Sequence, residues 1–261
     1  MSYRFLTIKR DGPVEHVVLN RPDVRNAFNA EMIGELTAWA GAFTRQSDAR
    51  VVVLSGAGRV FCAGADAAWM AETVSYSEAE NLRDAATASA MFRALDELPV
   101  PLIGRIHGAA IGGGAGLAAV CDIVVAEEQT VFGFTEVKLG IIPAVISPFV
   151  LAKIGASNAR ALFLTGERFD ATRAQAIGLV HRVVHIGDLD DAVNATISEI
   201  RSAGPYAVSA AKLLVRRVLD ATYEESRSIT AQAIANARIS PEGQEGLRAF
   251  LERRKAEFVN D

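Results

Sequence analysis

The residues of this chain that could do chemistry begin with a run of glycines. Gly112, Gly113 and Gly114 follow a predicted strand and precede a predicted helix. Because glycine has no Cβ atom, a ligand can approach this main chain closely, and the start of a helix adds a partial positive charge. Such N–H groups can form an oxyanion hole, which stabilises an oxygen that gains negative charge. The alternative use of these glycines is tight packing between the helix and the strand.

Binding of nucleotide phosphates is not predicted for this segment. The dinucleotide pattern G-x-G-x-x-G, begun at Gly112, fails because its last position is Leu117. A P-loop would require a Gly-Lys-Ser/Thr run, and none follows.

A second cluster of small residues comes earlier in the chain. The segments Ser55–Gly58 and Phe61–Asp66 follow a buried apolar strand that ends at Leu54. Ligands of α/β sheets collect at the carboxyl ends of the strands. We therefore expect the two small-residue clusters to direct one N–H each at a single point. A thioester or another carbonyl oxygen is the group that suits such a site.

Glu136 is the candidate for acid–base chemistry. It lies in the mostly apolar stretch 132–143, where desolvation should raise its pKa and suit it to proton transfer near neutrality. The alternatives are an ion pair with Lys138 and a helix-capping role.

Other chemistries find weaker support. The chain contains no G-x-S-x-G elbow, and Ser147 lies in a different context. Cys62 could be a nucleophile, but a cysteine among small residues more often serves packing. His181 and His185 have the spacing of zinc ligands, yet they lie in a strand-like run, so we predict no metal site.

The elements that must position these residues alternate between strands and helices, which indicates an α/β fold. Asn29 is a predicted helix N-cap, and Ser77 with Glu80 forms a predicted capping box. The predicted strands cover 5–10, 14–19, 51–54, 102–106 and 123–125. Helices dominate from Asp188 onward, and we predict them over 189–200, 207–219, 224–238 and 244–258. We divide the chain into a core, 1–195, and a helical C-terminal region, 196–261.

Composition restricts the class of protein. The 261 residues carry a net charge of −4, and half of them are hydrophobic. No basic block suits a nucleic-acid partner, and no apolar run suits a signal peptide or a membrane span. Only Cys62 and Cys121 are cysteines, which is typical of a reducing compartment. We expect a cytoplasmic protein without nucleic-acid or membrane partners.

Four motifs in order resemble the enoyl-CoA hydratase/isomerase (crotonase) superfamily over essentially the whole chain. They are Arg25–Asn29, Cys62–Asp66, Gly112–Gly116 and the segment around Glu136. Within this superfamily the chain is most similar to the bacterial methylglutaconyl-CoA hydratase branch. The segments that carry this similarity are NAFNAEMI, GADAAWM and EVKLGIIPAVISPF.

The resemblance implies a spiral of ββα turns whose C-terminal helices form trimers, which usually pair into hexamers. It implies an acyl-CoA substrate, with coenzyme A as part of the substrate and no separate cofactor. The two oxyanion-hole amides fall on Ala65 and Gly113. The implied coenzyme A contacts fall on Arg25, Ala63, Ala65, Asp66 and, from a neighbouring subunit, Arg253.

One departure from the family pattern concerns the reaction. Hydratases of this family commonly use two glutamates; Glu136 matches the second, and the first falls on Gly116. We predict addition of water to an α,β-unsaturated acyl-CoA. The alternative is a Δ3,Δ2-enoyl-CoA isomerase, which needs only one base. Lys138 could hold the distal carboxylate of a glutaconyl substrate or point into solvent. An RNA-associated member, a thioester hydrolase and a dehalogenase are further alternatives within this superfamily.

Overall fold

A six-stranded sheet forms the centre of the computed structural model, which describes residues 3–43 and 48–259. The strand order is β1-β2-β3-β4-β6-β9, and all neighbours are parallel except the β1–β2 hairpin. Gly12 takes a φ of +53° at the turn of that hairpin. The strands are β1 (Leu6–Asp11), β2 (Val14–Leu19), β3 (Val51–Gly56), β4 (Leu102–Ile106), β6 (Ile123–Glu127) and β9 (Arg182–Val184).

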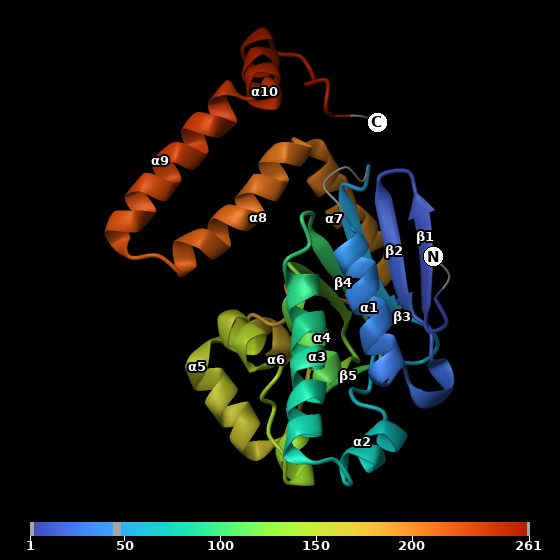
Figure 1. Ribbon diagram of the computed structural model, residues 1–261. Helices are drawn as coiled ribbons and strands as arrows, with labels where there is room; N and C mark the ends of the chain where they lie inside the picture. Colours follow the sequence, from blue (N-terminus) through green and yellow to red (C-terminus); the bar gives the residue numbers. More distant parts are fainter. Residues whose placement is uncertain (1–2, 44–47, 260–261) are drawn as a thin grey trace.

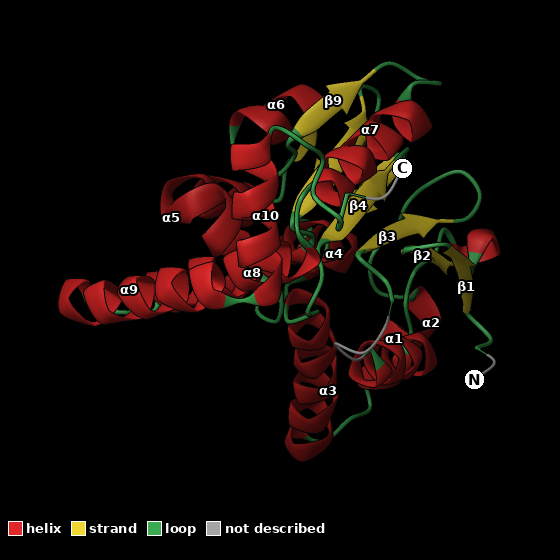
Figure 2. Ribbon diagram, turned by 90° about the horizontal axis from the view of Figure 1, so that it is seen from above, coloured by secondary structure: helices red, strands yellow, loops and turns green. Residues whose placement is uncertain are grey.

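Helices cover both faces of this sheet (Figure 2). Successive side chains of a strand point to opposite faces, so Val51 and Val53 pack with the apolar side of α7 (Leu189–Ser202). Val52 and Leu54 join the larger core on the other face. This two-sided burial explains why the 51–54 run is continuously apolar.

A small three-stranded sheet, which the sequence analysis did not predict, brings two segments together. Its strands are β5 (Ala109–Ile111), β7 (Val131–Gly133) and β8 (Arg168–Asp170). β5 and β7 are parallel neighbours, and the Gly112 N–H donates to Gly133 O at 2.7 Å. Because β5 leads into the glycine run and β7 leads toward Glu136, the small sheet sets these two segments side by side.

The predicted helix starts at Asn29 and Ser77 are confirmed. Asn29 Oδ1 accepts the Met32 N–H at 3.0 Å, and Ser77 and Glu80 form a complete capping box. The helices of the body are η1 (Pro22–Val24), α1 (Ala30–Ala42), α2 (Ala67–Thr73), α3 (Glu78–Asp96), α4 (Gly113–Val120), η2 (Glu136–Leu139), α5 (Ser147–Thr165), α6 (Ala171–Ala176) and α7.

The remaining helices project from the body as a C-terminal arm, residues 204–259 (Figure 1). The arm contains α8 (Pro205–Leu219), α9 (Tyr223–Ile239) and α10 (Pro241–Glu252). The helical character of this region is confirmed, but the predicted boundary at 195/196 falls inside α7, which packs on β4 and β6. The break in packing therefore comes after α7, and α7 belongs to the body.

The last predicted helix, 244–258, is displaced in the structure. α10 begins at Pro241 because Ser240 caps it, accepting the Gly243 N–H at 2.9 Å. It ends at Glu252 because Arg253 takes a left-handed φ of 56°. Among the described helices, none is both long enough and apolar enough to cross a lipid bilayer.

Candidate active site

The two clusters of small residues lie side by side. Cys62 forms a parallel bridge with Ala110, in which Cys62 N–H donates to Ala109 O and Ile111 N–H donates to Cys62 O, both at 3.1 Å. A Cβ atom on Gly64 would lie 2.6 Å from Ile111 O and 3.4 Å from Gly113 N. The loop before α2 and the N-terminus of α4 therefore meet at a distance that glycine alone permits.

Two main-chain N–H groups remain free where these segments meet. Gly64 O accepts the Phe28 N–H at 2.8 Å, and Phe28 O accepts the Asp66 N–H at 3.0 Å, so the Ala65 N–H between them points away from Phe28. Gly113 is the first residue of α4, where an N–H has no intrahelical acceptor. Neither amide has a hydrogen-bond acceptor within the described part of the chain. Both can therefore donate to an oxygen from outside the protein.

Glu136 presents its carboxylate to the start of α4. A Cβ atom on Gly112 would lie 3.2 Å from Glu136 Oε1, so the carboxylate lies against the residue that precedes Gly113. Glu136 Oε2 is buried without a hydrogen-bond partner. Burial raises the pKa of the Glu136 carboxyl above its usual value of 4.5. A partly desolvated carboxyl with an open oxygen beside free N–H donors is equipped to move a proton.

Lys138 does not pair with this carboxylate. Its side chain is exposed, and its Cγ and Cε atoms would each lie 3.2 Å from a Cβ atom on Gly166, the C-cap of α5. The predicted alternative of a Glu136–Lys138 ion pair is therefore wrong. The Lys138 ammonium lies where a cation is favoured, near the C-terminus of a helix.

The position of the missing acid, Gly116, is filled by other side chains. A Cβ atom there would overlap the Ile146 Cγ2 methyl and lie 3.2 Å from Phe92 Cε1. Ile146 and Phe92 are both almost fully buried. A second carboxylate has no room at this point, and the surface that replaces it is apolar.

The predicted coenzyme A contacts lie in two places. Arg25 is exposed, and its carbonyl oxygen accepts the Ala63 N–H at 3.0 Å, so Arg25 and Ala63 lie beside Ala65. Arg253 lies in the C-terminal arm, at the end of α10. The structure thus brings Arg25, Ala63, Ala65 and Asp66 together in one region and places Arg253 on a separate part of the molecule.

The Asp66 side chain is already engaged within the protein. It accepts the Ala68 N–H at 2.8 Å as the N-cap of α2 and forms an ion pair with Arg21 Nη2 at 2.8 Å. Burial opposes ionisation, but the Ala68 N–H and Arg21 outweigh it and hold the pKa of the Asp66 carboxyl below its usual value. Because the Asp66 carboxylate is engaged by these partners, Asp66 would contact a ligand chiefly through its main chain in this loop.

The other nucleophile and metal candidates have structural partners. Cys62 Sγ donates to Asn26 O at 3.1 Å, and burial raises the Cys62 pKa to about 12, so a reactive thiolate is disfavoured. His181 Nδ1 accepts the Val124 N–H at 2.9 Å, and His185 Nδ1 lies 2.8 Å from Glu128 Oε2. Within residues 3–43 and 48–259, no three His, Cys, Asp or Glu side chains gather as metal ligands would.

Sequence reasoning missed Arg21, Asn26 and Ile146. The first two hold the loop that carries Ala65, and Ile146 fills the space beside Gly116. Asn26 belongs to the motif Arg25–Asn29. What marks its role is the full burial of its side chain, and burial cannot be read from the sequence.

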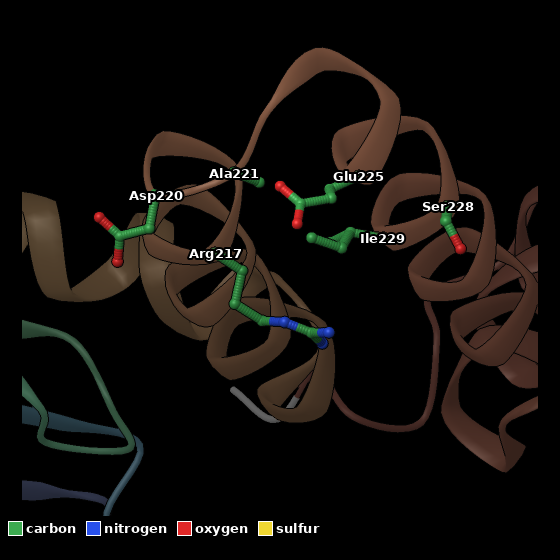
Figure 3. Close-up of a pocket in the computed structure, with 6 residues that line it drawn as sticks. All are labelled: Arg217, Asp220, Ala221, Glu225, Ser228 and Ile229. Carbon is green, nitrogen blue, oxygen red and sulfur yellow. The ribbon is translucent and has the colours of Figure 1, made fainter.

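Two large hollows lie away from these residues. One, of about 490 Å³, lies between α8 and α9 and is lined by Arg217, Asp220, Ala221, Glu225, Ser228 and Ile229 (Figure 3). The other, of about 1010 Å³, lies between α8 and the body and includes Phe149, Lys153 and Lys212 in its walls. None of the residues predicted for the active site lines either hollow.

A half-buried carboxyl beside two free amides on an α/β fold is typical of an enzyme that handles charge on a carbonyl oxygen. A model of the enoyl-CoA hydratase/isomerase family matches residues 9–261. The chain belongs to this family, and the predicted crotonase fold is confirmed.

Individual relatives match along nearly their whole length. A Thermus thermophilus protein is 33% identical over 95% of this chain and 98% of its own. The short-chain-enoyl-CoA hydratase of Clostridium acetobutylicum is 30% identical over 98% of both chains. The crystal structure of an enoyl-CoA hydratase from Shewanella pealeana superposes with a TM-score of 0.93, at 37% identity, over 97% of this chain and 96% of that one.

Proposed function

We propose that this protein is an enoyl-CoA hydratase that adds water to an α,β-unsaturated acyl-CoA. The observation that carries the proposal is the half-buried Glu136 carboxyl, whose buried Oε2 atom has no hydrogen-bond partner, beside the N-terminus of α4. The hydratase names of the Clostridium and Shewanella relatives support the same reaction.

The proposed mechanism uses three groups of this chain. The Ala65 and Gly113 N–H groups donate to the thioester oxygen and stabilise it as it gains enolate character. The Glu136 carboxylate takes a proton from water while the water oxygen bonds to Cβ, and the resulting carboxylic acid returns a proton to Cα. The product is a 3-hydroxyacyl-CoA. Loss of one oxyanion-hole donor typically costs about 10²–10³ in rate, so the amides supply a large share of the catalysis.

A second candidate reaction is isomerisation of a 3-enoyl-CoA to a 2-enoyl-CoA. The observation that favours it is the apolar filling of the space beside Gly116 by Ile146 and Phe92, which leaves no room there for a second catalytic carboxylate. A single base can remove a proton from C2 and deliver it to C4. Water is not incorporated in this reaction.

The resemblance to the methylglutaconyl-CoA hydratase branch carries a finer proposal, that 3-methylglutaconyl-CoA is the substrate. Its distal carboxylate requires a cation, and Lys138 lies instead over Gly166. We therefore set crotonyl-CoA, whose acyl group is uncharged, beside 3-methylglutaconyl-CoA in the assay. A kcat/KM at least tenfold higher for the dicarboxylic substrate supports the finer proposal, and the reverse order contradicts it.

We further propose that the protein works in the cytoplasm as a homotrimer or a pair of trimers. The C-terminal arm supports this assembly because it exposes large apolar side chains at three-quarters or more of their surface, a pattern typical of protein interfaces. These residues are Leu219, Tyr223, Ile239, Phe250 and Leu251. Arg253, on the same arm, would then reach the coenzyme A phosphates of a neighbouring subunit.

The test of the reaction measures turnover in H₂¹⁸O. Hydration of a 2-enoyl-CoA places ¹⁸O in the 3-hydroxyacyl product, whereas isomerisation of a 3-enoyl-CoA places none. We expect Glu136→Gln to lower kcat about 10²–10⁴-fold while acyl-CoA binding is retained. Glu167→Gln, at an exposed ion pair with Arg173, is the control and should keep the wild-type rate. A Glu136→Gln enzyme with near-normal turnover would remove Glu136 from the mechanism.

A further inference from the structure

Asn26 stands out as a buried polar residue that the proposed chemistry does not use. It is fully buried and takes a left-handed φ of 54°, a region where asparagine is tolerated better than most residues. Its side chain forms three hydrogen bonds: Nδ2 donates to Ala57 O at 2.7 Å and to Val60 O at 2.9 Å, and Oδ1 accepts the Arg21 N–H at 2.9 Å. Both amide hydrogens are therefore used.

These bonds join two loops that are distant in sequence. Ala57 and Val60 belong to the loop after β3, which continues into Phe61–Asp66. The main chain around Asn26 holds the continuation as well, because Asn26 O accepts Cys62 Sγ–H at 3.1 Å and Arg25 O accepts the Ala63 N–H at 3.0 Å. Asn26 thus lies at the centre of the contacts that fasten the Ala65 loop to the body.

Two further residues, Phe28 and Arg21, connect this network to Ala65 itself. Phe28, two residues after Asn26, donates to Gly64 O and accepts from the Asp66 N–H, so it holds the residues on both sides of Ala65. Arg21, which donates its own N–H to Asn26 Oδ1, also forms the ion pair with Asp66 and a hydrogen bond to Ala27 O. The direction of the Ala65 N–H is therefore set by a network whose buried node is Asn26.

We infer that Asn26 is a positioning residue for the Ala65 amide of the oxyanion hole. This inference rests on the proposed function. Asn26 does not meet the substrate; it acts through the loops 57–60 and 61–66. A donor misplaced by a fraction of an ångström loses most in the transition state, where the oxygen carries the most charge. A change at Asn26 should therefore lower kcat more than it weakens ground-state binding.

Asn26→Asp tests this with little change in shape, because Asp keeps one oxygen in the place of Oδ1 but cannot donate to both Ala57 O and Val60 O. We expect kcat for enoyl-CoA turnover to fall about 10–10²-fold, short of the loss of a whole donor. Butyryl-CoA has a saturated, uncharged acyl group and does not react. Its Kd for Asn26→Asp should stay within about threefold of the wild-type value, since uniform binding is little affected.

Binding of acetoacetyl-CoA provides a measurement that a purely structural role of Asn26 would not change. Its enolate places negative charge on the thioester oxygen and absorbs in the near ultraviolet. The wild type should bind it with an enhanced enolate band, and Asn26→Asp should lose affinity for it about 10-fold or more while retaining butyryl-CoA. Parallel losses for both ligands, or losses for neither in a folded variant, would overturn the inference.

Asn29→Ala is the matched control because it lies three residues away in the same segment. It removes the N-cap of α1, where the Asn29 side chain accepts the Met32 N–H, a bond within its own helix, so it should lower the Tm and leave kcat and the enolate band unchanged. If Asn26→Asp does not fold, Arg21→Lys decides in the same terms. Lysine keeps the charge beside Asp66 but lacks the fork that also reaches Ala27 O.

The outcomes also separate the two proposals. A wild type without enoyl-CoA turnover and without an enolate band overturns the proposed function and this inference with it. A wild type that shows both, with Asn26→Asp and Arg21→Lys indistinguishable from it, overturns the inference about Asn26 alone.

Discussion

At the scale of single residues, Glu136 couples activity and stability to pH in opposite directions. Burial raises the pKa of its carboxyl above 4.5, so the folded protein holds this proton more tightly than the unfolded chain. Protonated Glu136 therefore adds to the free energy of unfolding. This contribution is fully present below about pH 4.5 and is lost as the pH rises through the folded-state pKa. The same ionisation creates the base that hydration requires.

The pH prediction follows from this opposition. We expect the acid limb of kcat/KM for the wild type to have its midpoint above pH 4.5. The glutamine side chain of Glu136→Gln carries no charge. The Tm of this variant should therefore rise relative to that of the wild type as the pH rises toward 8, and the difference in Tm should shrink below pH 4. Thermal unfolding from pH 4 to 8 measures this. A difference in Tm that does not vary with pH contradicts the buried-carboxyl account.

Gly116 allows a second test at this scale. A Cβ atom there would overlap Ile146 Cγ2 and lie 2.9 Å from Ile146 Cβ. Gly116→Ala should therefore lower the free energy of unfolding by about 1–3 kcal/mol, the usual cost of overpacking, and Ile146→Ala in the same chain should recover part of it.

The control for Gly116 is Gly34, in α1, where a Cβ atom would meet nothing within 4 Å. Gly34→Ala should stabilise the protein by up to about 1 kcal/mol because alanine favours a helix. Urea unfolding compares the two. Gly116→Ala as stable as the wild type would show that Ile146 moves aside freely and that a side chain fits beside the active site.

At the scale of elements, the C-terminal arm is tied to the body by charged groups of α8. Lys212 Nζ donates to Val100 O at 3.1 Å and to Asp122 Oδ2 at 2.7 Å, while the same Asp122 oxygen accepts the Leu102 N–H at 2.7 Å. The Lys212 side chain is 16% exposed, so this pair is far better shielded than most ion pairs at a surface.

We expect Lys212→Met to lower the free energy of unfolding by about 1–3 kcal/mol, because it leaves Asp122 without its charged partner. It should also speed proteolytic cleavage at the junction of α7 and α8. Arg216→Met is the control; its pairs with Asp96 and Glu97 are more exposed and should contribute about 0–1 kcal/mol. Equal effects of the two variants would show that Lys212 is not the main attachment.

Elements with long, regular patterns could be predicted from the sequence, and those held by distant contacts could not. The run Val51–Leu54 is apolar at every position because both faces of β3 are covered, and that signal is local. The strands β5, β7 and β8 span three residues each, too few to show a period, and they form only because they pair with one another.

The same distinction between local patterns and distant contacts applies to the residues of the candidate site. The glycines and Glu136 could be predicted because their chemistry is carried by residue type. The apolar filling beside Gly116 could not, because Ile146 is distant in sequence and its approach depends on how α5 packs against α4. Lys138 could not be placed either, since its direction is set by Gly166 at the far end of α5.

At the scale of the whole molecule, one chain holds the parts of the proposed site in two separate places. Glu136, Ala65 and Gly113 lie in the body, whereas Arg253 lies on the projecting arm (Figure 1). If Arg253 serves the site of a neighbouring subunit, Arg253→Met should raise the KM for acyl-CoA about tenfold with little change in kcat, because a phosphate contact contributes uniform binding.

Mixed oligomers test whether that contact crosses between subunits. Glu136→Gln subunits have no base but keep Arg253, and Arg253→Met subunits have the base but bind coenzyme A weakly. After unfolding and refolding together, a shared site would combine Glu136 of one subunit with Arg253 of its neighbour, so turnover with the wild-type KM should reappear. Each variant refolded alone is the control. Activity that keeps the high KM at every mixing ratio would place Arg253 either in its own subunit's site or in no site, and would remove the reason for the active site to depend on assembly.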